Sequence, residues 1–252
     1  MPASLTSRTL HPNVEKHVSC TESKASRHTP LKDPSQSLHA NAEAAVAVAV
    51  ANQLSRRIAK RAIDIVGASI GLLLLLPLLT ACAIAVKLTS RGSVFFRQTR
   101  IGKGGIEFSL IKFRTMRNNA HHEVHLFKHL NEQDGPAFKI ANDPRITSVG
   151  RILRKFSLDE LPQLLNVLCG QMSLVGPRPP VPSEVLEYAD WQMRRITVKP
   201  GLTCIWQVWG RNRVSFHRWM EMDLAYIDNW SIWLDIKLIL HTLPAMLRGT
   251  GM

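Results

Sequence analysis

One apolar segment without a charged residue limits what this chain can fold into. Residues 65–86 form 22 consecutive uncharged positions that are dense in leucine. As a helix they would extend about 33 Å, which is close to the thickness of the hydrocarbon core of a bilayer. The sequence therefore predicts a helix that enters a membrane.

Two arrangements of this segment are compatible with its length: a straight span, and a helix that breaks and returns to the face it entered. Length alone favours the straight span. Pro77 lies near the middle, where it lacks a backbone N–H and clashes with the carbonyl of Leu73, so we expect a sharp bend. Basic residues flank both sides: Arg56, Arg57, Lys60 and Arg61 before, and Lys87 and Arg91 after. Because basic flanks prefer the cytoplasm, we predict the re-entrant arrangement.

The charge of the chain is strongly positive. It has 32 lysine and arginine residues against 19 aspartate and glutamate residues, a formal +13 that belongs almost entirely to residues 53–252. Such a surface attracts nucleic acids, anionic lipid headgroups, or the phosphates of nucleotides and lipids. The sequence has no helix-turn-helix, zinc-finger or RNA-binding signature. We therefore expect membrane lipids and phosphate-bearing substrates as partners, and no nucleic acid.

The four cysteines indicate the compartment. Cys20, Cys82, Cys169 and Cys204 are far apart and form neither a zinc-binding pair nor a disulfide framework. The first forty residues are polar and contain no signal peptide. These features predict a reducing, cytoplasm-facing location for the part of the chain outside the membrane.

The pattern of residues predicts an α-rich α+β fold in three parts. We expect a disordered polar tail over residues 1–50, a re-entrant membrane helix with its flanks over 51–91, and a catalytic domain over 92–250. In the last part we expect a β-hairpin of residues 93–101 and 106–116, helices over 146–156 and 158–168, and an amphipathic helix over 232–247 at the membrane interface.

Tryptophan and histidine residues cluster in the sequence. All six tryptophans lie between Trp191 and Trp233. We expect Trp230 and Trp233 at the level of the lipid headgroups, and Trp206 and Trp209 in or near the functional site.

Three histidines, at positions 121, 125 and 129, would share one face of a helix at metal-ligand spacing. No cysteine or carboxylate completes a ligand set, so a solvated helix face is the preferred interpretation.

Two adjacent carboxylates, Asp159 and Glu160, are the first candidates for chemistry. One interpretation is a capping box of Ser157 and Glu160, in which neither carboxylate is catalytic. Pro162 weakens it, because a helix capped by Ser157 would need the N–H that proline lacks. A helix that begins at Leu158 or Asp159 places Pro162 in the first turn. Asp159 would then lie at the positive end of the helix dipole, ionised and able to attack phosphorus.

A constrained arginine follows the two carboxylates. Arg178 lies between two prolines, so its guanidinium loses little entropy when it binds a phosphate through two hydrogen bonds. Gly176 would allow a ligand to approach closely. Arg154 and Lys112 are candidates for the remaining positive charge, although each alone is more often a solvated surface charge.

Six blocks of sequence, taken together, resemble the signature of the bacterial sugar transferases, the monotopic phosphoglycosyl transferases. The blocks are Lys112–Met116, Asp143–Thr147, Ser157–Leu164, Met172–Pro179, Lys199–Thr203 and Trp206–Asn212. They occur in the order typical of that family and cover about residues 56 to 250.

The resemblance implies transfer of a sugar 1-phosphate from a UDP-sugar to undecaprenyl phosphate, with Mg²⁺, at the cytoplasmic face of the bacterial inner membrane. It assigns Asp159 to a covalent phosphosugar intermediate and Glu160 to assistance, and either carboxylate to the metal. Further assignments are Lys112, Arg154, Arg178, Arg211 and Asp223 to the phosphates or substrate, and Pro77 to the helix break.

The sequence departs from the family pattern at Gln171, where many members have an acidic residue, so we expect no acidic role there. Likeness around residues 202–207 favours galactose or glucose as the sugar, and the oligomeric state is open. A rival from another class is a catalytically silent, basic adaptor at the membrane surface. The pairing of Asp159–Glu160 with nearby arginines argues against it.

Overall fold

The computed structural model describes residues 34–252, except for residues 121, 139, 141, 211–213 and 250–252. Its contacts divide the chain into residues 1–50 and residues 51–252. Of the first unit, the structure describes the beginning of helix α1, which runs from Pro34 to Thr89. The expected tail thus contains helix from Pro34 onward, because the alanines of residues 40–51 have high helix propensity. Residues 1–33 lie outside the described part.

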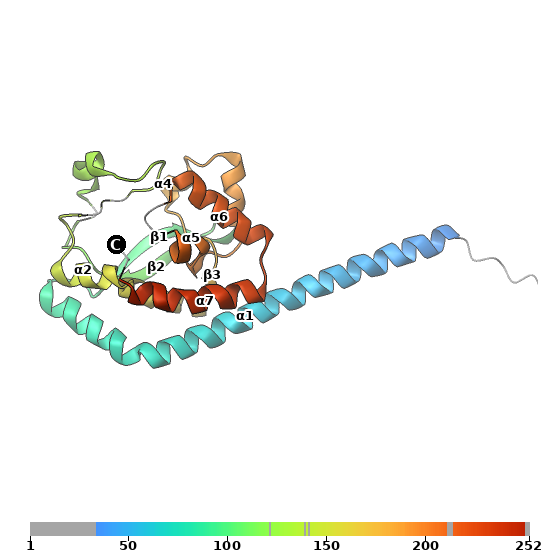
Figure 1. Ribbon diagram of the computed structural model, residues 1–252, viewed down its shortest axis with the longest axis horizontal. Helices are drawn as coiled ribbons and strands as arrows, with labels where there is room; N and C mark the ends of the chain where they lie inside the picture. Colours follow the sequence, from blue (N-terminus) through green and yellow to red (C-terminus); the bar gives the residue numbers. More distant parts are fainter. Residues whose placement is uncertain (1–33, 121, 139, 141, 211–213, 250–252) are drawn as a thin grey trace, which may run out of the picture. The chain divides into compact units, whose positions relative to one another are not determined.

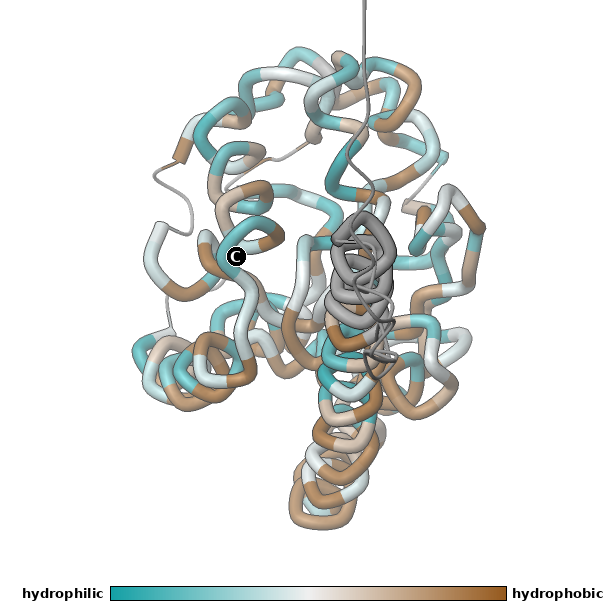
Figure 2. The backbone as a smooth tube through the Cα atoms, turned by 90° about the vertical axis from the view of Figure 1, so that its right-hand side faces the viewer, coloured by the Kyte–Doolittle hydropathy of each residue, from teal (hydrophilic) through white to brown (hydrophobic). Residues whose placement is uncertain are grey.

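The apolar stretch of α1 lies on the surface of the protein. Among the described residues, 48–89 form a helix that is long and apolar enough to cross a membrane. Leu73 and Leu74 are 72% and 73% exposed, and Figure 2 colours much of this stretch as hydrophobic. The helix continues through Pro77 and changes direction within this stretch (Figure 1), as expected for an internal proline.

Within the second unit, the opposite side of this part of α1 packs against the rest of the unit both before and after Pro77. Ala68 belongs to a hydrophobic cluster with Phe108 and Val167. Beyond the proline, Val86 belongs to a second cluster with Phe113. The end of α1 is held by the buried Arg114, whose guanidinium donates hydrogen bonds to the carbonyls of Ser90 and Arg91, at 2.8 and 2.6 Å. Such cations satisfy carbonyls left free at a helix C-terminus.

The predicted hairpin is confirmed. Strands β1 (Phe95–Ile101) and β2 (Glu107–Phe113) pair antiparallel, from Phe95 opposite Phe113 to Ile101 opposite Glu107. The turn contains the short η1 (Lys103–Gly105), where Gly104 and Gly105 have positive φ angles of 71° and 81°.

The two predicted helices that follow are present. Helix α2 (Ser148–Lys155) begins at Thr147, whose hydroxyl accepts a hydrogen bond from the N–H of Gly150. The helix expected over 158–168 is divided into the 3₁₀ segment η3 (Leu158–Gln163) and α3 (Leu164–Leu168). Pro162 lies in the 3₁₀ part, since it cannot donate the hydrogen bond of a continuous α-helix. Gly170 follows α3 with a φ of 79° and ends it.

A second, parallel pair of strands was not predicted. Strand β3 (Ser173–Val175) pairs with β4 (Gly201–Thr203), with Ser173 opposite Gly201 and Val175 opposite Thr203. Three-residue strands give no period-two pattern, and the pairing joins segments far apart in the sequence.

The remaining elements complete a mostly helical domain (Figure 1). They are η2 (Val124–Leu130), α4 (Pro182–Val185), η4 (Asp190–Thr197), α5 (Ile205–Trp209), α6 (Phe216–Asp228) and α7 (Ile232–Leu247). Helix α7 is the expected amphipathic helix: it buries Leu238 and exposes Trp233, Leu240 and Leu247.

Candidate active site

The structure brings five of the predicted site residues together. Asp159 and Glu160 lie on η3, which packs against α2 and β2. Arg154 lies on α2 and Lys112 on β2. Arg178 comes three residues after β3, and its guanidinium contacts Glu160.

Asp159 is a buried carboxylate, with only 7% of its surface exposed. Burial raises its pKa to about 6, and the neighbouring Glu160 adds to the rise, while Lys112 and Arg154 oppose it. At pH 7 a carboxyl of this pKa is mainly ionised. Asp159 is therefore available as a nucleophile, but its burial outweighs the helix-dipole effect that we expected to control it.

The capping box considered for Ser157 does not form. Ser157 has a left-handed φ of 56°, and its side chain makes no capping hydrogen bond. A non-glycine residue in this conformation is uncommon. The turn aims the following Asp159 into the protein instead of capping the helix.

Lys112 and Arg154 supply positive charge beside Asp159. Burial lowers the pKa of Lys112 to about 8, with Asp159 opposing this effect, so the amine is still mainly protonated at pH 7. The Nε of Arg154 donates a hydrogen bond of 2.9 Å to the hydroxyl of Thr115, which orients the guanidinium. Burial also lowers the pKa of Arg154. Both cations compensate a charge on Asp159 or on a bound phosphate.

Arg178 pairs with the second carboxylate of the dyad. Its Nη1 lies 3.3 Å from Oε1 of Glu160, and its guanidinium carbon lies 6.0 Å from the centre of the Trp206 ring. Asp159 and Glu160 thus have different surroundings, as expected for different roles. The contact also places Trp206 beside the site, as predicted.

The backbone around Arg178 is held by a close contact of two glycines. A Cβ on Gly201 would lie 2.0 Å from the nitrogen of Gly176, and the N–H of Gly201 donates to the carbonyl of Pro177 at 2.8 Å. We expected Gly176 to allow a ligand to approach. The structure shows that it allows strands β3 and β4 to approach each other, which fixes the chain just before Arg178.

Arg100 belongs to the site and was missed from the sequence. It is buried, and its guanidinium donates hydrogen bonds to the carbonyl of Pro179 and to Gln98, at 2.9 and 2.8 Å. Burial and the nearby Arg178 lower its pKa to about 10. Alternate residues of a strand share a face, so Arg100 and Phe96 lie on the same face of the hairpin. Phe96 is paired with Lys112 across the hairpin, so Arg100 and Lys112 also share this face. This alternation along the strand is the feature of the sequence that could have identified Arg100 as a site residue.

Asp223 is buried next to the site. Its Oδ2 accepts hydrogen bonds from Nη2 of Arg195 at 2.7 Å and from Nε1 of Trp219 at 3.0 Å. The same Arg195 nitrogen donates to the carbonyl of Arg178 at 2.9 Å. Burial raises the pKa of Asp223 to about 6, against the effect of Arg195. Asp223 therefore supports the backbone of Arg178 through Arg195.

The structure describes only some of the remaining candidates for the site. Arg211 and His121 lie outside the described residues. Trp209 contacts Lys237 and His241 of α7. In the described part of the chain, no group of three histidine, cysteine or acidic residues is arranged to hold a metal ion.

A small cavity of about 10 Å³ lies between these groups, which is about the room that one water molecule needs. Its lining includes Arg100, Lys112, Glu160, Gln163, Arg178 and Gln207. Together with Asp159 and Arg154, the site contains four cationic side chains and two carboxylates. This excess of positive charge suits a ligand with two negative charges, such as a diphosphate.

Comparisons with known proteins agree with this chemistry. Residues 55–249 match the profile of the family described as "Bacterial sugar transferase". The chain is 46% identical to the galactosyl transferase CpsE of Streptococcus agalactiae, over 78% of this chain and 44% of that protein. It is 42% identical to the exopolysaccharide production protein ExoY of Rhizobium meliloti, over 77% of this chain and 87% of that protein.

A third relative has a more detailed name. It is the UDP-glucose:undecaprenyl-phosphate glucose-1-phosphate transferase of Caulobacter vibrioides, with 44% identity over 75% of this chain and 69% of that protein. The chain thus spans less than half of CpsE and most of ExoY.

Proposed function

Because the chain belongs to the bacterial sugar transferase family, we propose that it is a phosphoglycosyl transferase that moves a sugar 1-phosphate from a UDP-sugar to undecaprenyl phosphate. In this role it would begin the synthesis of an exopolysaccharide, capsule or O-antigen. The observation that supports this most directly is the buried Asp159 among Lys112, Arg154 and the Arg178–Glu160 pair. A silent membrane adaptor has no need for a buried carboxylate in a cationic site.

In the proposed first step, a carboxylate oxygen of Asp159 attacks the phosphorus attached to the sugar. The new bond joins Asp159 to the phosphosugar, and the bond from this phosphorus to the bridging oxygen breaks. UMP leaves with the electron pair of that bond. Lys112, Arg154 and Arg178 stabilise the negative charge on the phosphate oxygens during this displacement.

In the second step, a phosphate oxygen of undecaprenyl phosphate attacks the same phosphorus. The bond to Asp159 breaks, and its carboxylate is restored. Glu160, on the Arg178 side of the dyad, has no part in the covalent bond. When the diphosphate binds, Glu160 would separate from Arg178, and the guanidinium of Arg178 could then bind the phosphate oxygens.

The residues present fit a magnesium ion. Mg²⁺ is commonly bound by one or two carboxylates together with phosphate oxygens of the substrate and water. Asp159 and Glu160 offer two adjacent carboxylates of this kind, and Glu160 lines the cavity. When bound, the ion would neutralise charge on the diphosphate.

We propose that α1 is re-entrant and that the domain lies at the cytoplasmic face of the inner membrane, and the contacts of α1 support the re-entrant arrangement. Lys60, which precedes the apolar stretch of α1, pairs with Asp235, and Arg114 binds the carbonyls of Ser90 and Arg91 directly after the end of α1. Both contacts join α1 to the same domain. If α1 crossed the bilayer as a straight span, the two ends of its apolar stretch would lie on opposite sides of the membrane, and one of the two contacts could not form. The exposed leucines around Pro77 would enter the lipid, and the exposed face of α7, with Trp233, would lie at the interface.

The test of the function is a reaction in nanodiscs that contain undecaprenyl phosphate. Wild-type protein is mixed with UDP-glucose, UDP-galactose and their N-acetylated forms, and UMP release is measured. The Asp159→Asn variant should release no UMP and should trap no radiolabelled phosphosugar. The exposed Asp228→Asn is the matched control and should react normally. Near wild-type turnover by Asp159→Asn would refute the covalent mechanism.

A further inference from the structure

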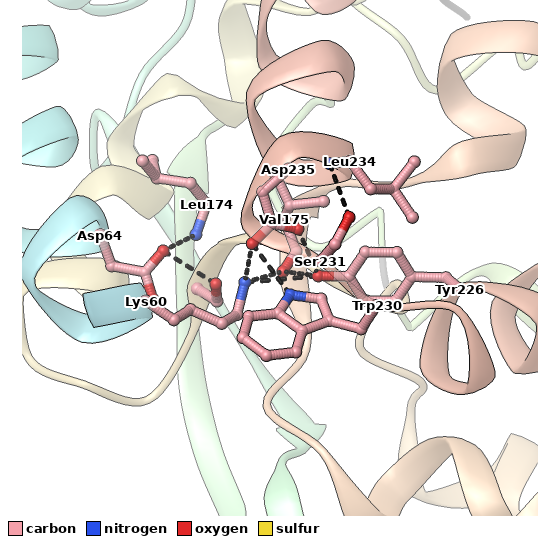
Figure 3. A network of polar contacts seen from close by, with 10 residues as sticks. Lys60, Asp64, Leu174, Val175, Tyr226, Trp230, Ser231, Leu234 and Asp235 are labelled. Atoms are coloured by element: carbon pink, nitrogen blue, oxygen red, sulfur yellow. Dashed lines mark hydrogen bonds and ion pairs between the residues drawn. The ribbon is translucent and has the colours of Figure 1, made fainter. Parts of the chain in front are cut away.

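The last charged turn of α1 before its apolar stretch makes direct contacts with the catalytic domain. We expected Lys60 and Arg61 to act only as basic flanks that set the topology. Lys60 instead pairs with the buried Asp235 of α7 at 2.6 Å, and Asp64, one helical turn later, is itself buried with 3% exposure. Figure 3 shows these side chains pointing from α1 toward β3 and α7.

Two of these side chains bind the backbone of β3. Oδ1 of Asp64 accepts hydrogen bonds from the hydroxyl of Ser173 at 2.8 Å and from the N–H of Leu174 at 2.9 Å. Nζ of Lys60 donates to the carbonyl of Val175 at 3.1 Å. The hydroxyl of Tyr226 lies within 3.0 Å of the same carbonyl and contacts both Lys60 and Asp235. Every residue of β3 is therefore bound by α1 or by the network around Lys60.

Strand β3 leads directly to the arginine of the site. Only Gly176 and Pro177 separate Val175 from Arg178. Proline restricts the backbone, and the other side of β3 is closed by the Gly176–Gly201 contact. A shift of β3 relative to α1 would therefore be passed on to the guanidinium of Arg178.

The third residue of the turn binds the segment that carries the dyad. The guanidinium of Arg61 donates hydrogen bonds to the carbonyls of Val167 and Leu168, at 2.6 and 2.8 Å. These carbonyls end α3, which continues η3 and its Asp159–Glu160 pair. One turn of α1 thus contacts both segments whose relative position sets the distance from Asp159 to Arg178.

Resting on the function proposed above, we propose that Lys60, Arg61 and Asp64 are positioning residues of the transferase. They set Arg178 and the dyad at the spacing that the diphosphate requires. The membrane helix is then part of the architecture of the active site as well as an anchor. Displacement of its charged turn would weaken binding of the UDP-sugar first, because Arg178 would no longer reach the phosphate.

Arg56 provides a matched control for Lys60. It lies one turn earlier on α1 and contacts the Trp230 ring from 5.3 Å, whereas Lys60 contacts both this ring and β3. Arg56→Gln and Lys60→Gln remove the same charge from the same flank, so any effect on topology is shared. Asp64→Asn keeps an oxygen that accepts from Ser173 and Leu174, whereas Asp64→Leu does not.

Steady-state kinetics in nanodiscs separate positioning from anchoring. We expect Lys60→Gln and Asp64→Leu to raise KM for the UDP-sugar about 10- to 100-fold, with a smaller change in KM for undecaprenyl phosphate. Arg56→Gln and Asp64→Asn should stay close to wild type. In an Arg178→Ala background, Lys60→Gln should cause little further loss, since both changes affect one interaction.

Equal losses in Arg56→Gln and Lys60→Gln, or losses that multiply in the Arg178→Ala background, would overturn the proposal. Hydrogen exchange gives a readout that needs no substrate. Amides of residues 173–178 should exchange faster in Lys60→Gln and Asp64→Leu than in Arg56→Gln and wild type, and unchanged exchange would also overturn it. Wild-type protein that releases no UMP from any UDP-sugar would refute the proposed function, while the exchange result would still decide the positioning role.

Discussion

Replacing Asp159 with asparagine should abolish activity and at the same time stabilise the fold. Burial raises the pKa of this carboxyl from its ordinary value of 3.8 to about 6. The ionised form is therefore disfavoured by folding, and the nearby Lys112 and Arg154 compensate it only in part. Asparagine has nearly the same shape and no charge, so the variant removes this cost.

The magnitude follows from linkage between protonation and folding. A carboxyl with a pKa of about 6 in the folded protein and 3.8 in the unfolded chain costs about 3 kcal/mol when it is ionised at pH 7. For an acid with a raised pKa, the cost is complete above pH 6 and fades as the pH falls toward 4. Because the asparagine amide must also be buried, we expect a gain of about 1–3 kcal/mol at pH 7. Near pH 4 the gain should be below about 1 kcal/mol.

Thermal unfolding in nanodiscs, followed by tryptophan fluorescence, measures this effect. A gain of this size should raise Tm by about 5 °C at pH 7, and the difference between variant and wild type should narrow at lower pH. Asp228→Asn, at an exposed surface pair with Arg194, should change Tm little. A Tm of Asp159→Asn below that of wild type at pH 7, or a difference independent of pH, would refute the reasoning from burial.

Four further changes test other parts of the structure. Arg178→Lys keeps the charge but loses the planar guanidinium that can form two hydrogen bonds, so kcat/KM for the UDP-sugar should fall about 10- to 100-fold. Unchanged kinetics would show that Arg178 does not bind the phosphates. Gly201→Ala places a Cβ 2.0 Å from the nitrogen of Gly176 and should lower the free energy of unfolding by about 2–4 kcal/mol in denaturant titrations. Gly104→Ala, where the space is open and only the positive φ of 71° is unfavourable, should cost less, about 1 kcal/mol. Pro77→Leu should favour a straight membrane span, because leucine restores the helical hydrogen bond that proline cannot make. Cys20 of this variant should then react with an impermeant maleimide added outside the inner membrane. Labelling of Cys20 in the wild-type protein would contradict the re-entrant helix. Removal of divalent ions with EDTA should stop UMP release, and added Mg²⁺ should restore it.

Local patterns in the sequence were sufficient for the elements near the site. β-Branched and aromatic residues on both sides of a glycine-rich turn predicted β1 and β2, and the amphipathic pattern after Asp143-Pro144 predicted α2. These features depend on residues close together in the chain, whose preferences act before any tertiary contact forms. The candidates Asp159, Glu160, Arg154, Arg178 and Lys112 were also found from the sequence, because charged residues in constrained positions are conspicuous there.

The sequence did not reveal which charges support the site from behind. Asp223 was assigned to the phosphates or substrate, and the sequence did not show that it binds Arg195, which in turn binds the carbonyl of Arg178. Arg100 was missed, yet it lies in the wall of the cavity. Whether a cation contacts a substrate or a buried carbonyl depends on packing between segments far apart in the chain, and residue type does not encode it.

By itself, the sequence determined the kinds of chemistry available: an apolar helix with a central proline, a carboxylate dyad and an excess of cations. Only the tertiary structure decided how these parts act together. It buried Asp159 and raised its pKa, and it joined β3 to β4 at Gly176 and Gly201. It also bound the turn containing Lys60 to the strand before Arg178. Burial and long-range pairing arise only when distant segments exclude water together, so a linear pattern cannot specify them.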